Sequence, residues 1–304
     1  MKNKYSVVVF AYNVSAHIAS CIERIFENPI DVDVYIIANG CSDSTEQIVK
    51  GLQAEHNNLH LVSLPIADKA SAWNYYIYNV ANNAAVHFFV DGDITIEKNA
   101  LSSIINTINR NPSVNIVGGV PIVGRDKDGW IQRMKVYGRV SGGLYALQND
   151  FIEKIRHHHV KLPIGFVGDD FLVSSLAKNM LDFRGFNSAS PRLIIDSSAG
   201  FSFQQISYMR MSDYYLYLRR LIRYKIRDYQ LLMLINSFVK HNATEIPISV
   251  YELYDNSVDT VNYYWRGRTT LIDWIAVFMI KKQLFKNRKT ASLKDVRGQK
   301  GSID

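Results

Sequence analysis

Short apolar runs rich in β-branched residues alternate with helix-like segments through the first half of the chain. The runs predict buried strands over residues 7–11, 32–38, 59–64, 86–90 and 114–121. The segments between them predict helices over residues 14–26, 44–52, 70–80 and 99–108, because their apolar residues recur at helical spacing. Strands separated by helices of this length indicate an α/β fold, with a mostly parallel sheet and helices on both faces. Such a sheet binds its ligand beyond the carboxyl ends of its strands.

The pattern changes after residue 121. Residues 122–166 predict an irregular segment, because glycines recur there without a helical or strand period. A short helix is predicted over residues 171–178, directly after Asp169 and Asp170, strands over 193–195 and 200–203, and long helices over 214–239 and 269–286. We therefore expect an α/β domain over residues 1–208, a helical region over 209–288 and a polar, frayed tail over 289–304.

Charge is unevenly distributed along the chain. Its 304 residues include 35 Lys and Arg against 28 Asp and Glu, a net charge of +7. From Met209 onward there are 17 Lys and Arg against 9 Asp and Glu, so this region carries +8 and the first 208 residues carry −1. The basic C-terminal third predicts contact with an anionic surface or substrate. No recognisable nucleic-acid-binding module accompanies it, so nucleic acid is not expected as a partner.

Composition and cysteine usage narrow the class of protein. With 47% hydrophobic and 21% charged residues, the chain is expected to fold around a core. Cys21 and Cys41 lack the spacing of zinc ligands, and the N-terminus has no apolar signal core. No segment approaches the roughly 20 apolar residues that a membrane-spanning helix needs. These features predict a cytoplasmic protein, located at the inner face of the cell membrane if its basic region binds lipid.

Two carboxylates follow the apolar run that ends at Val90. Asp91 and Asp93 are separated by Gly92, and the period of a strand points both side chains the same way. Gly92 would let a ligand approach the backbone between them. Two oxygen donors at the carboxyl end of a strand suit a divalent cation that takes phosphate oxygens as further ligands. The alternative is a turn that merely ends the strand.

Five ordered motifs, this pair among them, resemble those of the family 2 glycosyltransferases, the large inverting group with the GT-A fold. The matching residues are a donor-contacting turn at Ala11, Tyr12 and Asn13; a loop with Asn39 and Gly40; a helix start at Lys69; the D-x-D motif at Asp91, Gly92 and Asp93; and an acceptor loop at Gly142 and Gly143 followed by the catalytic pair Asp169 and Asp170. The resemblance covers residues 5–180 and implies a Rossmann-like GT-A domain.

The reaction implied by this resemblance is transfer of a hexosyl or N-acetylhexosaminyl group from a nucleotide-sugar donor, a UDP-sugar in the first instance, to a hydroxyl group with inversion. The acceptor would be a saccharide or a lipid-linked acceptor in bacterial surface polysaccharide or glycolipid synthesis. Mg²⁺ or Mn²⁺, held by Asp93 with help from Asp91, would neutralise charge on the leaving diphosphate. The alternatives are a non-catalytic nucleotide-sugar-binding or membrane-binding module, and a sugar nucleotidyltransferase, although residues 10–15 lack the Gly-rich loop of the latter class.

The resemblance assigns the general base to Asp170. Asp169 would then orient an acceptor hydroxyl, and repulsion between the adjacent carboxylates would raise one pKa. The structural alternative for either residue is the N-cap of the helix that follows. Lys69 would contact the donor phosphates or base, and its structural alternative is a solvated lysine at a helix start.

The loop after the second predicted strand departs from the family pattern at Asn39. The family commonly has a carboxylate there, which contacts the base of the donor nucleotide. An amide keeps an acceptor and adds donors, so the identity of the base stays open. In the same loop, Asp43 and Glu46 match a D-x-x-E capping box, which predicts a structural role for Asp43.

The C-terminal helices carry two further candidates. Arg220, Arg223 and Tyr224 resemble a relaxed Q-x-x-R-W element and would bind the diphosphate or an acceptor phosphate, the alternative being a solvated basic face. Residues 271–280 are apolar and too short to span a bilayer, so they predict peripheral contact with an anionic membrane or a buried core helix. Four basic residues flank this stretch, namely Arg266, Arg268, Lys281 and Lys282.

Overall fold

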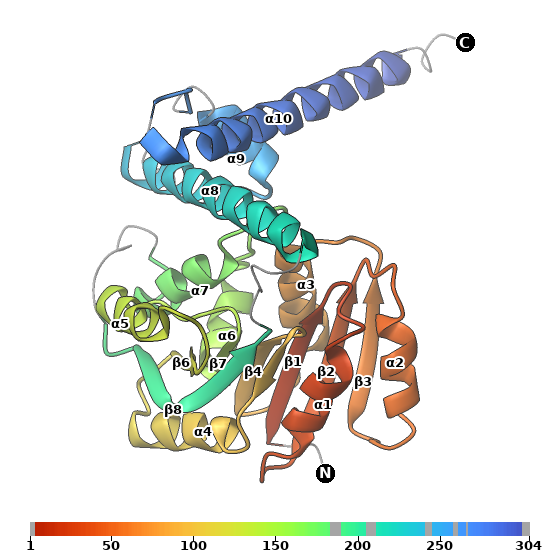
Figure 1. Ribbon diagram of the computed structural model, residues 1–304, viewed down its shortest axis with the longest axis vertical. Helices are drawn as coiled ribbons and strands as arrows, with labels where there is room; N and C mark the ends of the chain where they lie inside the picture. Colours follow the sequence, from red (N-terminus) through yellow and green to blue (C-terminus); the bar gives the residue numbers. More distant parts are fainter. Residues whose placement is uncertain are drawn as a thin grey trace. The chain divides into compact units, whose positions relative to one another are not determined.

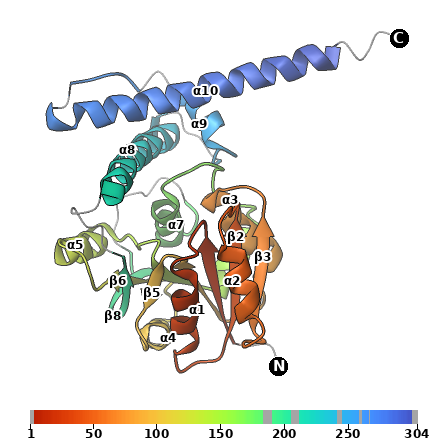
Figure 2. The ribbon, with the colours of Figure 1, turned by 45° about the vertical axis from the view of Figure 1, so that its right-hand side comes forward.

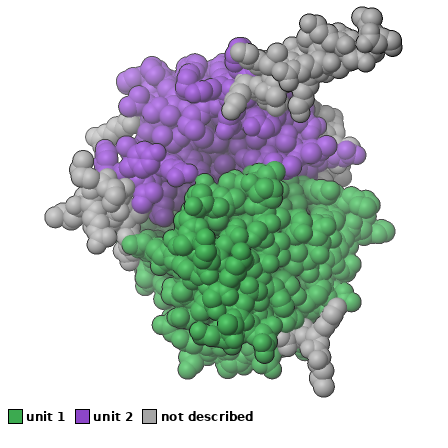
Figure 3. All heavy atoms as spheres, turned by 90° about the vertical axis from the view of Figure 1, so that its right-hand side faces the viewer, with its two compact units in different colours: residues 1–162, 169–205 green, residues 163–168, 206–304 purple. Residues whose placement is uncertain are grey.

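The computed structural model describes residues 4–182, 190–204, 211–240, 245–257, 261–265 and 267–299, which form two compact units (Figure 3). The first unit comprises residues 1–162 and 169–205, and the second comprises residues 163–168 and 206–304. Residues 163–168 thus belong to the second unit, although both of their chain neighbours belong to the first. The expected boundaries at residues 208 and 288 stay predictions.

The first unit alternates strands and helices (Figure 1). Its strands are β1 (Tyr5–Ala11), β2 (Val32–Asn39), β3 (Leu59–Leu64), β4 (Val86–Asp91), β5 (Ile94–Ile96), β6 (Ile116–Pro121), β7 (Leu144–Gln148) and β8 (Leu193–Phe203). Its helices are α1 (Ile18–Phe26), α2 (Thr45–Leu52), α3 (Lys69–Tyr75) with the π-helical turn η1 (Tyr76–Val80), α4 (Ala100–Arg110), α5 (Lys127–Tyr137), α6 (Asn149–His157) and α7 (Asp169–Lys178). The five strands and four helices predicted for the first half are present, although α1 begins four residues later than predicted.

The strands form one mixed sheet in the order β3-β2-β1-β4-β7-β6-β8-β5. β1 pairs in parallel with β2 and β4, and β2 pairs in parallel with β3. β7 runs antiparallel to both of its neighbours, and β5 runs antiparallel to β8. The four parallel strands bring the carboxyl ends of β1, β2 and β4 to one edge, where such folds bind their ligands.

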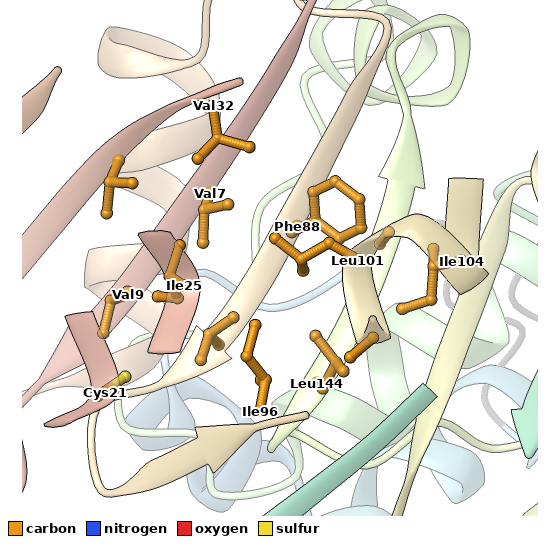
Figure 4. Packing of buried hydrophobic residues seen from close by; sticks show 14 of the residues in the cluster. Val7, Val9, Cys21, Ile25, Val32, Phe88, Ile96, Leu101, Ile104 and Leu144 are labelled. Carbon is orange, nitrogen blue, oxygen red and sulfur yellow. The ribbon is translucent and has the colours of Figure 1, made fainter. Parts of the chain in front are cut away.

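Helices cover both faces of this sheet (Figure 2). On one face, α1, α2 and α4 bury apolar side chains in a cluster that Figure 4 shows around Val7, Ile25, Phe88 and Ile104. On the other face, α3 and η1 pack aromatic rings against β4 and β7, where Phe89 stacks on Tyr145 with ring centroids 4.8 Å apart. Burial of both faces explains the continuous apolar runs of β1, β2 and β4. The mostly parallel sheet with helices on both faces is confirmed.

The prediction of an irregular segment over residues 122–166 is wrong, because that segment contains α5, β7 and α6. α5 buries only Met134, so it carries no helical period of apolar residues. β7 has five residues and directly follows Gly142 and Gly143. The strands predicted over 193–195 and 200–203 are the two ends of the single strand β8.

The second unit consists of α8 (Met211–Lys240), α9 (Val250–Ser257), the 3₁₀ turn η3 (Gly267–Thr269) and α10 (Thr270–Gln299). α8, α9 and α10 pack on one another. The tail predicted as frayed from residue 289 is helical as far as Gln299, and residues 300–304 lie outside the described residues. Among the helices of the described residues, none has an apolar stretch that would let it cross a membrane.

Residues 163–168 are bound to the second unit by backbone pairing. The amide of Ile164 donates to the carbonyl of Ile248 at 3.0 Å, and the amide of Val250 donates to the carbonyl of Ile164 at 2.9 Å. The amide of Val167 donates to the Gln230 side chain at 2.8 Å. Because Gln230 and Ile248 are far along the sequence, this membership follows from tertiary pairing and not from local sequence.

Candidate active site at the carboxyl edge of the sheet

The strand register aligns the ends of β1, β2 and β4. Asp91, the last residue of β4, lies opposite Phe10 of β1, and Ala11 lies opposite Ala38 of β2. The residues that follow each strand therefore emerge side by side at one edge. This register brings together the first, second and fourth of the predicted motifs.

Lys69 links two of the predicted carboxylates at this edge. As the first residue of α3, it places Nζ 2.6 Å from Oδ1 of Asp91 and 3.1 Å from Oδ2 of Asp169. Its side chain is 20% exposed, that of Asp91 31% and that of Asp169 9%. Lys69 is therefore not the solvated lysine of the structural alternative, because its ammonium forms a partly buried bridge between two carboxylates.

The electrostatics of this cluster follow from two carboxylates paired with one ammonium, while the charge of Asp93 acts on Asp91. Burial alone would lower the pKa of Lys69, but Asp169 and Asp91 outweigh it and raise that pKa well above its usual value. Burial also raises the pKa of Asp91 to about 6, a rise that Lys69 opposes and Asp93 supports. Near neutral pH, Lys69 is thus charged.

The two glycines of the predicted acceptor loop have different environments. A Cβ atom on Gly142 would lie 3.0 Å from Nζ of Lys69 and 3.4 Å from Oδ2 of Asp91, so a side chain there would crowd the ion pair. A Cβ atom on Gly143 would lie 2.5 Å from the ring of Phe201, which makes Gly143 a packing residue. Only Gly142 therefore borders the charged cluster directly, whereas Gly143 accepts a hydrogen bond from the Asp91 amide at 3.3 Å.

The D-x-D motif divides its two carboxylates between different environments. Asp91 is engaged by Lys69, whereas Asp93 is exposed and forms no hydrogen bond or ion pair with any residue that the structure describes. The expected role of Gly92 in admitting a ligand stays a prediction, and the structure shows a packing reason for a glycine here. Its amide donates to the Phe10 carbonyl at 2.9 Å, and a Cβ atom there would lie 3.0 Å from that oxygen, so β1 takes up the space.

The turn after β1 is tied to the loop after β2. Ala11 is buried, Tyr12 is 45% exposed, and Asn13 adopts a left-handed φ of 51°. The Asn13 carboxamide oxygen accepts from the backbone amide of Ser42 at 2.8 Å. This hydrogen bond therefore fixes the turn after β1 to the loop after β2, the two segments that were predicted to contact the donor. The ring of Tyr12 stays open to solvent.

The predicted capping box is wrong. Asp43 accepts from the Thr45 hydroxyl at 2.6 Å and from the Ser15 amide at 3.0 Å, while the N-cap of α2 is Ser44. Glu46 accepts from the hydroxyl of Ser63 instead of reaching back to the helix start. Burial would raise the pKa of the Asp43 carboxyl, but these hydrogen bonds lower it to about 2. Asp43 therefore joins the starts of α1 and α2.

Asn39 and Gly40 lie at the end of β2. Asn39 is 4% exposed, and its carboxamide oxygen has no hydrogen-bond partner among the described residues. A buried carbonyl oxygen without a partner is costly, so this atom is suited to a ligand N–H group. Gly40 has a φ of +70°, and a Cβ atom there would lie 2.6 Å from the backbone nitrogen of Ala67. Gly40 is thus required by the turn itself.

The predicted catalytic pair begins α7. Asp169 and Asp170 are the first two residues of this helix, so neither occupies the N-cap position of the structural alternative. Asp169 is buried against Lys69, whereas Asp170 is half-buried and its Oδ1 atom accepts from the Phe171 amide at 2.8 Å. The two adjacent carboxylates therefore have different contacts, since Asp169 pairs with the ammonium of Lys69 and Asp170 accepts from a backbone amide at the helix start.

Two aromatic residues of this site were not predicted. The indole N–H of Trp73 donates to the hydroxyl of Tyr145 at 3.0 Å, and both side chains are fully buried. Burial raises the pKa of Tyr145 well above its usual value despite the nearby charge of Lys69. Tyr145 could have been found only by predicting β7, which the sequence pattern hides.

Asn74, on α3, has a structural role. Its side chain donates to the carbonyl of Leu162 and accepts from the amide of Leu162, both at 2.8 Å. It therefore fixes the last residue of the first unit before residues 163–168.

The residues predicted on the C-terminal helices lie in the second unit. Arg220, Arg223 and Tyr224 are exposed on α8, and the guanidinium of Arg227 lies 5.1 Å from the Tyr224 ring centroid. Their binding to the diphosphate or to an acceptor stays a prediction.

The carboxylate oxygens at this edge of the sheet are suitable ligands for a divalent cation. Within the described ranges, no group of three or more His, Cys, Asp or Glu side chains is placed to hold a metal ion. Asp93 nevertheless offers an exposed hard-oxygen ligand near Asp91. Mg²⁺ and Mn²⁺ are commonly held by one or two protein carboxylates together with substrate phosphates.

Comparison with known proteins identifies the class to which this site belongs. The family model for glycosyl transferase family 2 matches residues 6–171, more than half of the chain. The chain therefore belongs to glycosyl transferase family 2, and the resemblance inferred from its motifs is confirmed. This membership separates it from the sugar nucleotidyltransferases.

Solved structures share its fold. A mannosyltransferase, PcManGT from Pyrobaculum calidifontis in complex with GDP-Man and Mn²⁺, has a TM-score of 0.57 and 17% identity, over 98% of this chain and 83% of that one. S. aureus TarS 1-349 in complex with UDP-GlcNAc has a TM-score of 0.52 and 12% identity, over 92% of this chain and 80% of that one. The fold is thus GT-A, as predicted, with C-terminal helices.

Proposed function

We propose that the protein transfers a hexosyl or N-acetylhexosaminyl group, with inversion, from a nucleoside diphosphate sugar to an acceptor hydroxyl. The observation that carries this proposal is the bridge from Lys69 to Asp91 and Asp169. This bridge joins Asp91 at the end of β4, where the donor would bind, to Asp169 at the start of α7, where the acceptor would bind. Catalysis requires these two sides to be held in one geometry, because reacting groups must be positioned to within a fraction of an ångström.

The two carboxylates that begin α7, Asp169 and Asp170, have different roles in this proposal. Asp170 acts as the general base that removes the proton from the acceptor hydroxyl. Asp169 is held by Lys69 and orients the acceptor. The family resemblance assigns the base to the second residue of the pair, which is Asp170. The position of Asp170 at the start of α7, directly after the Asp169 that Lys69 holds, supports this assignment.

Asp93, with help from Asp91, would hold Mg²⁺ or Mn²⁺. The cation, when bound, supplies charge neutralisation for the departing diphosphate. The exposure of Asp93 supports its role as the main ligand, whereas Asp91 already pairs with Lys69. M. tuberculosis glucosyl-3-phosphoglycerate synthase, which has a TM-score of 0.50 to this chain, was crystallised with Mn²⁺ and UDP.

Asn39 is the proposed contact for the nucleotide base, and a UDP-sugar is the proposed donor. Its unpartnered oxygen suits the ring N–H of uracil, and its NH₂ group suits the adjacent carbonyl. Guanine presents the same acceptor and donor pair, so a GDP-sugar is the alternative. TarS with UDP-GlcNAc and PcManGT with GDP-Man represent the two possibilities among proteins of this fold.

The proposed acceptor is a saccharide or a lipid-linked saccharide in bacterial surface polysaccharide or glycolipid synthesis. Arg220, Arg223 and Tyr224 would bind a phosphate of the donor or of that acceptor, because exposed guanidinium groups beside aromatic rings suit phosphate oxygens. We place the reaction in the cytoplasm, where nucleotide sugars are made. The free thiols of Cys21 and Cys41 support a reducing compartment.

The test is release of nucleoside diphosphate by the purified chain. UDP-Glc, UDP-Gal, UDP-GlcNAc and GDP-Man are each incubated with Mn²⁺, with Mg²⁺ or with EDTA, in the presence and absence of simple saccharides. We expect one donor to be hydrolysed slowly with metal and faster when a suitable acceptor is added. Binding of the donor without any release, with or without acceptor, would instead favour the non-catalytic module.

A further inference from the structure

α10 has one buried face and one exposed apolar face. The side chains of Ala276, Val277, Ile280 and Leu284 are at most 5% exposed and lie on the side that packs against α8 and α9. The opposite side exposes large apolar residues at spacings of three, four and seven, which keeps them on one side of a helix. These are Leu271, Trp274, Phe278 and Phe285, with exposed fractions of 69%, 42%, 57% and 72%.

A loop extends this surface with three more aromatic residues. Tyr263, Tyr264 and Trp265 are 49%, 54% and 80% exposed. The indole N–H of Trp274 donates to the carbonyl of Tyr264 at 3.1 Å, and the rings of Tyr263 and Trp274 meet edge to face with centroids 6.4 Å apart. The loop is therefore fixed to α10. We call these three residues, with Leu271, Trp274, Phe278 and Phe285, the aromatic surface.

The charges on this surface have one sign. Nζ of Lys281 lies 5.1 Å from the ring centroid of Tyr263, and Nζ of Lys282 lies 6.0 Å from that of Phe278. Asp273 is the only acidic residue in 261–265 and 270–285, and it is 2% exposed and lies 3.4 Å from Lys225. The sequence of 286–299 adds five Lys and Arg against one Asp. Arg266 and the side chain of Arg268 lie outside the described residues.

We propose that the aromatic surface and its two lysines bind the protein to an anionic lipid bilayer. Trp and Tyr favour the interface between headgroups and acyl chains, where their apolar rings are buried and their polar atoms stay wet. Lysines extend their ammonium groups to lipid phosphates while their stems cover apolar surface. A helix with this arrangement lies in the plane of the interface. A second copy of the chain would instead bring like charges together.

Membrane binding does not depend on which sugar is transferred or on whether transfer occurs. An experiment can therefore disprove membrane binding without disproving the proposed function.

The test is co-sedimentation with vesicles of phosphatidylcholine alone or with 30% phosphatidylglycerol, at 50 and 500 mM NaCl. The wild-type protein is expected to bind the anionic vesicles at low salt, and to bind them less at high salt. Each lysine near an anionic surface contributes about a five-fold gain in affinity, so K281Q/K282Q should bind about 25-fold more weakly.

A second variant isolates the aromatic contribution. Trp265→Ser, Phe278→Ser and Phe285→Ser together replace exposed side chains, and they should weaken vesicle binding at least ten-fold because their apolar area no longer leaves water. The matched control is Ile66→Ser with Val136→Ser, two residues of the first unit that are 57% and 58% exposed, and it should bind like the wild type. Diphosphate release without vesicles should be unchanged in all of these variants.

Three outcomes overturn the proposal. The first is no binding of the folded protein to anionic vesicles at 50 mM NaCl. The second is binding that neither variant weakens, because another surface would then be responsible. The third is a wild-type dimer in sedimentation velocity that the aromatic variant converts to a monomer without any vesicle binding, since the surface would then join two copies.

Discussion

The ammonium of Lys69 lies 3.1 Å from the carboxylate of Asp169, a residue one hundred positions later in the chain. The same ammonium lies 2.6 Å from Asp91, so one cation holds the ends of two elements together. Asp169 is 9% exposed and depends on this cation, because a buried carboxylate without a partner is strongly disfavoured. Lys69 is thus a positioning residue as well as a candidate ligand for the donor.

Replacing Lys69 should therefore affect both stability and catalysis. Lys69→Met leaves two negative side chains without their cation, and we expect a loss of about 2–3 kcal/mol in the free energy of unfolding. This is less than for a fully buried pair, because Asp91 is partly exposed. Urea denaturation measures the change, and kcat/KM should fall with it. Lys69→Arg should restore part of both, and Lys98→Met, at an exposed lysine, should change neither.

Asp93 should account for the cation dependence of nucleotide binding. Calorimetric titration of the wild-type protein with the nucleoside diphosphate should give an affinity at least about ten-fold higher with Mn²⁺ than with EDTA, because the cation offsets the charge of the phosphates. Asp93→Asn should remove most of this difference. Asp128→Asn, at an exposed aspartate of α5, serves as the control. Equal affinities with Mn²⁺ and EDTA would eliminate the cation role.

Asp170→Asn should lower turnover by about 10² to 10⁴-fold, the usual range for loss of a general base. The affinity for the donor should stay close to that of the wild-type protein, because the assigned donor residues are unchanged. Asp150 is a matched control, since it is the second residue of α6 as Asp170 is the second residue of α7. If Asp170→Asn retained near wild-type turnover, Asp169 would become the candidate base.

His87 should make the fold sensitive to acid. It is fully buried, its Nδ1 atom accepts from the Tyr76 hydroxyl at 2.8 Å, and burial lowers its pKa from 6.5 to about 4. As the pH falls from 6.5, the unfolded chain takes up this proton first, so the free energy of unfolding decreases until about pH 4. The loss is at most about 3 kcal/mol.

Urea denaturation at several pH values tests this linkage. His87→Gln removes the titrating group, so its free energy of unfolding should decline less steeply between pH 6.5 and 4 than that of the wild-type protein, whatever its absolute stability. Parallel slopes for the two proteins would show that His87 does not contribute to the acid sensitivity.

The sequence was most informative where burial leaves a regular pattern. β1, β2 and β4 are covered on both faces, so their apolar runs predict strands near the observed bounds. α5 exposes nearly all of its side chains, and β7 is short and preceded by glycines, so neither has such a pattern. The candidate site shows the same difference between local sequence pattern and tertiary packing. Motif spacing identified Lys69, Asp91 and Asp169 separately, whereas their ion pairs depend on packing between distant elements.

Other parts of the site were hidden for local reasons. The fit of Asp43 and Glu46 to a capping box was misleading, because Asp43 bonds to both Thr45 and Ser15, while Glu46 bonds to Ser63 and does not reach back to the helix start. Gly92 matched a ligand-contacting position, but the sequence did not indicate that the carbonyl of Phe10 also packs closely against it. A short motif specifies neither the neighbouring strand nor the hydrogen bonds that compete for the same atoms.

The division of the chain at residues 163–168 has a consequence for the order in which activity and structure are lost. The amide of Leu162 is held by Asn74 in the first unit, whereas those of Ile164 and Val167 are held by the second. Hydrogen exchange at the Leu162 amide should therefore report opening of the first unit. Exchange at the Ile164 amide should report opening of the second unit. Melting of the second unit alone would release the backbone directly ahead of Asp169, so it should inactivate the protein while the sheet stays folded.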